Sequence, residues 1–196
     1  MSIRLLFILI IGITLSGCAT TDDVNLAKSA EGSWSAELRF PLSEELTMAQ
    51  DIRWTFADID KNRGSLVEVR QISFAQKRDE AIVEYYLTSQ INGWFDVYDG
   101  DLYLHYSTPT LIVNVDSLNV VPRTDVPAEI AEGIAKYNAH YRQQLANDMR
   151  ETLHEGLSED FERYVVDGAA YLDLSVAADS LFCTATDLGR IGFIRK

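Results

Sequence analysis

A cysteine near the amino terminus is the residue of this chain best placed to do chemistry. Cys18 follows the small residues of Leu15–Gly17, a composition that suits a cleavage site. Before them, Leu5–Ile13 is an apolar run, and Arg4 supplies a positive charge ahead of it. A basic start, an apolar segment and small residues in this order predict that residues 1–17 are a removed signal peptide.

The segment Leu15–Cys18 resembles the lipobox of bacterial lipoproteins. The resemblance implies that the Cys18 thiol takes a diacylglyceryl group, and that cleavage then leaves it as the acylated first residue. Ala19, rather than an aspartate, follows the cysteine, which by the same resemblance favours sorting to the outer membrane. The expected location is the cell envelope, at the periplasmic face of the outer membrane, with the lipid on Cys18 as the membrane partner.

A transmembrane helix is the alternative interpretation of this start. The apolar stretch Leu5–Gly17 has 13 residues, or about 20 Å of helix, against a hydrocarbon core of about 30 Å. It is too short to span a bilayer. The small and polar residues that follow predict that 18–31 is a lipidated amino terminus with a flexible tether, spanning roughly 20 Å.

The remaining residues, 32–196, have the length of a single domain. In the full chain of 196 residues, 30 acidic side chains outnumber 17 basic ones, giving a net charge of −13. This charge argues against a nucleic-acid partner, which requires a basic face. If Cys18 is acylated, Cys183 has no disulfide partner, and the apolar alternation around it predicts a buried, unreactive thiol.

Alternating apolar residues dominate the first two thirds of this domain. In Leu66–Phe74, for example, Leu66, Glu68, Arg70 and Ile72 share one face. Asp99-Gly100 between two alternating runs is a strong signal for a hairpin. We expect a further turn and a new strand at Ile91–Trp94. Strands joined by such turns predict an antiparallel meander of roughly seven strands.

The periodicity then changes to that of a helix. Asp125 is a candidate cap, and a continuous apolar stripe predicts an amphipathic helix over about 127–156, ended by Gly156. The stripe consists of Ile130, Ile134, Tyr137, Tyr141, Leu145, Met149, Leu153 and Leu157. A second, short helix is expected over Ser158–Val165. About three more strands follow, at residues 170–176, 181–185 and 190–195.

This order predicts a mainly β fold, an antiparallel meander that closes into a barrel of about 8–10 strands because closure removes exposed edges. The inserted helix would cover one mouth or one outer flank. Gly32-Ser33-Trp34 at the start of the first strand resembles the Gly-x-Trp opening of lipocalins and related calycin barrels. The resemblance implies that Trp34 packs at a closed barrel end against a late basic residue, Arg195 or else Arg190. Lipocalins place their main helix after the barrel, so this chain departs from them there.

Other motifs point to no catalytic or metal chemistry. Asp58-x-Asp60-x-Asn62 begins like a calcium-binding EF-hand loop, but its glycine is one place late and Val69 stands where that loop needs glutamate. A hairpin turn is the simpler interpretation. The histidines, at positions 105, 140 and 154, lack the spacing of metal ligands, and no nucleophile or phosphate-loop motif occurs in 19–196. The sequence therefore predicts a protein that is not an enzyme and holds no cofactor or metal.

Two functions remain open. The leading hypothesis is a non-enzymatic, lipid-anchored envelope protein that binds a small apolar or amphiphilic ligand in a barrel pocket. The candidates for the pocket or for packing at a barrel end are Trp34, Trp54, Trp94 and Arg195. The alternative is a structural or assembly lipoprotein whose barrel is filled by side chains and which acts through an envelope protein partner. The volume inside the barrel separates the two.

Overall fold

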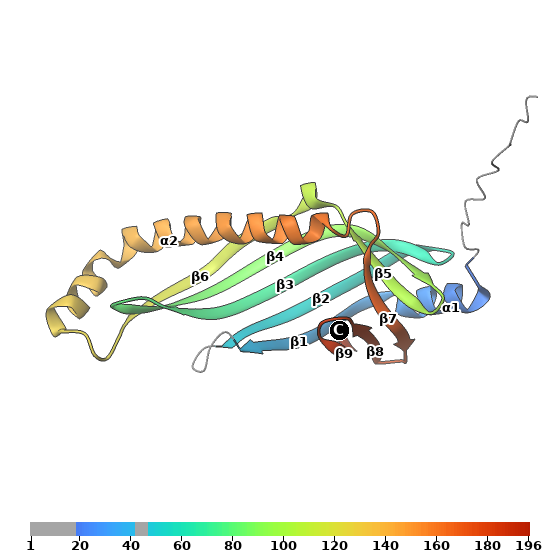
Figure 1. Cartoon of the computed structure of the whole chain (residues 1–196), viewed down its shortest axis with the longest axis horizontal. Helices are drawn as coiled ribbons and strands as arrows, with labels where there is room; N and C mark the ends of the chain where they lie inside the picture. Colours follow the sequence, from blue (N-terminus) through green and yellow to red (C-terminus); the bar gives the residue numbers. More distant parts are fainter. Residues whose placement is uncertain (1–18, 42–46) are drawn as a thin grey trace, which may run out of the picture.

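The computed structural model describes residues 19–41 and 47–196 (Figure 1). Cys18 and the predicted signal peptide lie outside the described residues, as do the side chains of Tyr137 and His140. The described strands are β1 (Gly32–Pro41), β2 (Thr47–Asp60), β3 (Arg63–Lys77), β4 (Ala81–Tyr98), β5 (Asp101–Tyr106), β6 (Ile112–Pro122), β7 (Ala169–Val176), β8 (Ser180–Ala185) and β9 (Gly189–Arg195). Helix α1 (Thr21–Ala30) precedes them, the 3-10 turn η1 (Thr108–Thr110) follows β5, and α2 (Ala128–Glu162) separates β6 from β7.

The strands form one antiparallel sheet that closes on itself. Neighbours follow the order β3-β2-β1-β9-β8-β7-β5-β4, and β4 pairs back to β3, which makes a closed barrel of eight strands. β6 is an additional strand that pairs with β4 outside this ring. The predicted mainly β fold, a barrel with a helix inserted before the last strands, is confirmed.

The sheet is rolled at one end and open at the other, because β4 changes partner along its length. β4 pairs with β6 over Ala81–Gln90 and with β5 over Gly93–Tyr98. Likewise, β1 meets β9 through Trp34 and Ser35. The rolled part is termed the barrel. The open part, termed the wing, consists of residues 36–41, 47–52, 70–77, 81–90 and 112–122.

β4 continues without a break where the sequence predicted a turn at Ile91–Trp94, so that prediction is wrong. Gly93 lies at the point where β4 exchanges β6 for β5. A Cβ atom at this position would come within 2.0 Å of the carbonyl oxygen of His105 on β5. The glycine therefore allows two backbones to approach closely inside a strand, rather than bending the chain.

α2 covers the inner face of the wing. Leu145 is buried against Ile72, Val83 and Leu118, which point inward from three wing strands. The predicted stripe is partly correct, since Met149 and Leu153 pack against this cluster. Tyr141, by contrast, is 57% exposed.

The predicted end of the helix at Gly156 is wrong, because α2 continues as one helix to Glu162. The predicted second helix is therefore its last part. Leu157 and Phe161 of these final turns are buried in the core at the barrel mouth. Their burial stabilises a helix that Gly156, by propensity alone, would weaken.

The amino-terminal segment is also more ordered than predicted. Residues 18–31 were expected to be a flexible tether, but Thr21–Ala30 form helix α1. Thr20 caps this helix, and its side chain and that of Asp23 bond reciprocally to each other's backbone N–H. Ala27 and Ala30 are fully buried against the barrel. Docking of these two alanines explains how ten largely polar residues stay helical.

Candidate functional site

Large side chains fill the inside of the barrel. Trp54 stacks on Phe193 with 4.1 Å between ring centroids, and Phe56 packs on Phe95 at 4.6 Å. Several other large residues have less than 2% of their surface exposed: Trp34, Leu66, Ile91, Leu102, Leu104 and Leu181. The barrel is thus a packed core of close-fitting rings and aliphatic side chains rather than a ligand pocket lined by them.

The two helices close the two mouths of the barrel. At one mouth, α1 places Ala27 and Ala30 in the core. At the other, the last turns of α2 bring in Phe161, whose ring lies 4.4 Å from that of Tyr106 on β5. Figure 1 shows α1 at the far end of the barrel from the stretch that α2 covers. A ligand would have to displace one of these helices to enter.

A carboxylate lies buried within this core. Glu68 on β3 is 1% exposed. Its Oε2 accepts hydrogen bonds from Trp54 Nε1 at 2.7 Å and from the Tyr106 hydroxyl at 2.8 Å. Its Oε1 accepts from Arg70 Nε at 2.5 Å. Both oxygens therefore have donors, one of them a cation, which is what a charge needs to be tolerated in an apolar interior.

The surroundings of Glu68 hold the neighbouring phenols in their neutral form. Burial, and then the negative charge of Glu68, raise the pKa of Tyr106 well above its usual value. The pKa of Tyr171 is raised for the same two reasons. The Arg70 guanidinium in turn lies 5.0 Å from the ring centroid of Phe161. A closed set of matched donors and acceptors links β2, β3 and β5, while the guanidinium adds a contact to α2. Its chemistry is structural, because no group in it faces solvent as a free acid or base.

Trp34 and Arg195 lie together at the α1 end of the barrel. Trp34 on β1 pairs directly with Arg195 on β9, whose guanidinium lies 4.4 Å from the indole centroid. Trp34 Nε1 donates to the carbonyl of Ala30 at 2.7 Å, and Arg195 reaches the carbonyl of Ser29. These residues therefore take the arrangement that the lipocalin resemblance implied, and they also hold the carboxyl end of α1. Arg190, the other candidate, lies over Phe182 instead.

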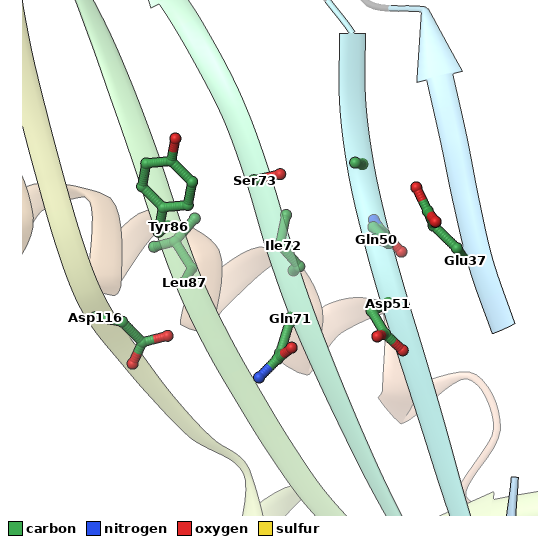
Figure 2. Close-up of a pocket in the computed structure, with 10 residues that line it drawn as sticks. Glu37, Gln50, Asp51, Gln71, Ile72, Ser73, Tyr86, Leu87 and Asp116 are labelled. Atoms are coloured by element: carbon green, nitrogen blue, oxygen red, sulfur yellow. The ribbon is translucent and has the colours of Figure 1, made fainter. Parts of the chain in front are cut away.

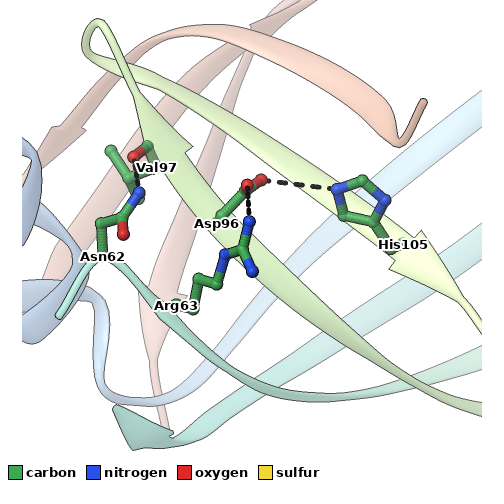
Figure 3. Close-up of polar contacts among 5 residues, drawn as sticks. All are labelled: Asn62, Arg63, Asp96, Val97 and His105. Carbon is green, nitrogen blue, oxygen red and sulfur yellow. Dashed lines mark hydrogen bonds and ion pairs between the residues drawn. The ribbon is translucent and has the colours of Figure 1, made fainter. Parts of the chain in front are cut away.

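Trp94 lies on the outside of the barrel, so a place for it in an internal pocket is excluded. It is 39% exposed and stacks on His105 at 3.5 Å. His105 Nε2 lies 3.4 Å from Asp96 Oδ1, and Arg63 approaches the same carboxylate at 3.8 Å (Figure 3). Phe95 and Val97 point inward, which sends Trp94 and Asp96 to the outer face.

Sequence reasoning missed this outer cluster, although a signal was present. The Asp99-Gly100 hairpin fixes the register of β4 and β5, and that register pairs Trp94 with His105. His105 Nδ1 is buried and has no hydrogen-bond partner among the described residues. The ring is also closely covered by Gly168, where a Cβ would meet it at 2.8 Å. A histidine packed between an indole and backbone in this way is a packing element rather than an exposed base.

The wing carries a shallow groove on the face away from α2. The groove has a volume of about 390 Å³ and is lined by acidic and amide side chains, among them Glu37, Asp51, Gln71 and Asp116 (Figure 2). Tyr86, beside them on β4, is 45% exposed. Thr88 donates to Asp116 at 2.6 Å. This groove is polar and open, unlike a pocket for an apolar ligand.

The remaining candidates are structural. Asp58-x-Asp60-x-Asn62 lies at the β2–β3 hairpin as predicted, and Asn62 donates to the carbonyl of Val97 at 2.7 Å. Across the described residues, no three His, Cys, Asp or Glu side chains gather in a way that could hold a metal ion. Cys183 is buried, as predicted, and burial raises the pKa of its thiol to about 12.

Comparison of the chain with protein family models and with curated proteins finds no match. Within residues 19–41 and 47–196, neither helix combines the length and the apolar character that crossing a bilayer requires. The barrel itself is consistent with a lipocalin-like fold.

Proposed function

We propose that this chain is a non-enzymatic, lipid-anchored protein of the cell envelope that acts through a protein partner, with its barrel serving as a solid support. Acylation of Cys18 at the membrane, and a location at the periplasmic face of the outer membrane, are part of the proposal. The lipocalin-like barrel is, on this account, a scaffold rather than a container for a small molecule.

The filled interior is the observation that carries the proposal. Trp54, Phe193 and Phe56 occupy the space where a lipocalin-like carrier would hold its ligand. The buried Glu68 is engaged by protein donors at both oxygens, so it offers no free group to a guest. Internal binding would require a helix to leave its mouth and stacked rings to separate. These costs favour action at the surface.

Three experiments test the anchor, the solid barrel and the protein partner. For the anchor, the full chain and the Cys18→Ser variant are expressed in a Gram-negative host with an alkynyl fatty acid. The label is expected on the wild type, in the outer-membrane fraction, and is expected to be lost from Cys18→Ser. Acylation of the variant would contradict the assignment of Cys18.

For the barrel, the acylated wild type is purified in detergent and weighed by native mass spectrometry after release of the detergent. The expected result is the mass of the processed polypeptide with its acyl group. A stoichiometric apolar molecule retained on the protein would overturn the scaffold proposal and favour a ligand carrier. Cross-linking in intact cells completes the test, because a reproducible envelope protein partner is expected for the wild type and reduced capture for Cys18→Ser.

A further inference from the structure

The docked helix α1 has a consequence for how the protein stands on a membrane. We propose that acylation of Cys18 seats the α1 end of the barrel directly against the lipid surface and points the wing away from it. The α1 end is defined as α1 with the β2–β3 turn at residues 60–63 and the β4–β5 turn at residues 98–101. This inference rests on the acylation in the proposed function and adds an orientation to it.

The chain between Cys18 and α1 is short. Cys18 is two residues before Thr20, the residue that caps α1. Two residues reach at most about 7 Å, even when fully extended. An acyl group on Cys18 must therefore lie within that reach of the start of α1. The sequence predicted a flexible tether of 13 residues instead. Such a tether would leave the barrel free to take any orientation relative to the membrane.

Both ends of α1 are fixed to the barrel. At its start, Asp23 is 2% exposed, and its Oδ1 accepts from the backbone N–H of Gly100 in the β4–β5 turn at 3.0 Å. At its end, the carbonyls of Ser29 and Ala30 accept from Arg195 and Trp34. The helix therefore cannot swing on its own, and the position of its first residue fixes the position of the barrel.

The turns of the α1 end lie near the start of α1, and the far tip of the wing lies at a distance from it. The two turns of the α1 end are joined, because Val97 N–H donates to the carbonyl of Asn62 at 2.9 Å. β4 runs from this end to the wing tip, the β3–β4 turn at residues 77–81, over 18 residues. At about 3.3 Å a residue this places the wing tip roughly 55 Å away. Figure 1 shows α1 and the wing tip at opposite ends of the molecule.

The exposed charge at the α1 end is mixed. Asp22, Asp60 and Asp99 are exposed there, and so are Lys28, Lys61 and Arg63. Anionic headgroups attract clusters of basic residues. Vesicles without anionic lipid remove this attraction, so binding to them is expected to depend on the acyl group.

Energy transfer to the membrane tests the orientation. The acylated full chain carries one donor dye, either at Tyr98→Cys near the α1 end or at Asp79→Cys on the wing tip. Buried Cys183, with its raised pKa, is expected not to react. Each protein is reconstituted in phosphatidylethanolamine-rich vesicles with acceptor-labelled lipid. Transfer is expected to be several-fold higher from position 98 than from position 79.

A linker variant is the matched control. Nine Gly and Ser residues inserted between Ala19 and Thr20 leave Cys18 and the α1 cap unchanged, but give a flexible reach of about 17 Å. The difference between the two positions is expected to shrink towards equality. Equal transfer from both positions without the linker, in protein whose acylation is shown by mass, would overturn the orientation alone. Absence of acylation would overturn both this inference and the proposed anchor.

Discussion

The barrel and the wing share strands β1, β2, β3 and β4, yet the inner face of this sheet is buried in two different ways. In the barrel the sheet curls round and its own side chains meet, as Trp54 meets Phe193. In the wing the sheet stays open, and α2 supplies the second layer through residues such as Leu145. Closure packs side chains against one another across the barrel, whereas the helix layer covers the inner face of the wing alone.

The chemistry of the two interiors differs accordingly. The barrel holds a charged pair, the buried Glu68 and the partly buried Arg70, beside aromatic rings. The interior of the wing is mainly aliphatic, with Tyr85 stacked on Phe74. A closed barrel can hold a charge because donors converge on it from several strands. The inner face of the wing is covered by α2 alone, so its interior consists of the apolar side chains that one helix can bury. The barrel should therefore be sensitive to lost polar partners, and the wing to added polarity.

The largest effect is expected at the buried charge of the barrel. Glu68→Ala leaves the Arg70 guanidinium, the Trp54 N–H and the Tyr106 hydroxyl without their acceptor. We expect unfolding free energy to fall by about 3–5 kcal/mol, as for other broken buried pairs. Denaturant unfolding measures this loss. Replacing Glu68 and Arg70 together by Met removes the unpaired guanidinium but still leaves the Trp54 N–H and the Tyr106 hydroxyl without an acceptor, so it should recover part of the loss. A double variant no more stable than Glu68→Ala would show that the unpaired guanidinium is not a source of the loss.

In the wing, a charge placed under α2 should have the next largest effect. Leu145→Asp puts an unpaired carboxylate into the cluster around Ile72 and Val83 and should lower the unfolding free energy by about 3 kcal/mol. Gln144→Asp, one residue away on the exposed side of α2, is the control and should change it little. If Leu145→Asp melts like the wild type but loses a partner, this face of α2 is a docking surface instead.

At the α1 end of the barrel, the pH dependence of stability tests how α1 is docked. Burial opposes ionisation of Asp23, but hydrogen bonds from Thr20 and Gly100 outweigh it and lower the carboxyl pKa. A lowered folded-state pKa stabilises the protein above the unfolded value of about 3.9, and that stability is lost as the pH falls through the folded value. Asp23→Asn should therefore cost about 1 kcal/mol at pH 7, the size of a helix cap, and less in acid. Asp22→Asn, on the exposed side of the same turn, is the control and should lower the unfolding free energy less at pH 7.

The smallest effect is expected at Gly156 in α2. This glycine lies inside the helix, and a Cβ there would have no atom within 4 Å. Gly156→Ala should therefore raise unfolding free energy by about 0.5–1 kcal/mol, through helix propensity alone. Thermal melting detects this as a small upward shift. A decrease would mean that α2 needs its flexibility at the point where it passes from the wing to the barrel mouth.

Local patterns predicted the outline of the fold, since alternation and the Asp99-Gly100 turn report directly on strands and hairpins. Local patterns gave wrong predictions where tertiary contacts determine the structure of a segment. Glu68 and Arg70 occupy inward-facing positions of an alternating run. Because both are charged, the sequence did not indicate that their face of the strand points into the core. α1 is helical because Ala27 and Ala30 dock, and Gly93 remains in a strand because β5 passes close to it. The pairing of Trp34 with Arg195 was predicted through the resemblance to lipocalins. No local sequence pattern indicates that β1 lies beside β9.

The central claim, that the barrel is solid, is tested most directly by melting the protein with and without benzene. A ligand that binds the folded state raises its melting temperature, and apolar cavities of engineered proteins take up benzene. The wild type should show no shift, whereas Phe193→Ala, which removes the ring stacked on Trp54, should melt lower and recover part of the loss with benzene. An upward shift of the wild type itself would contradict the account, because it would reveal space in the barrel for an apolar guest.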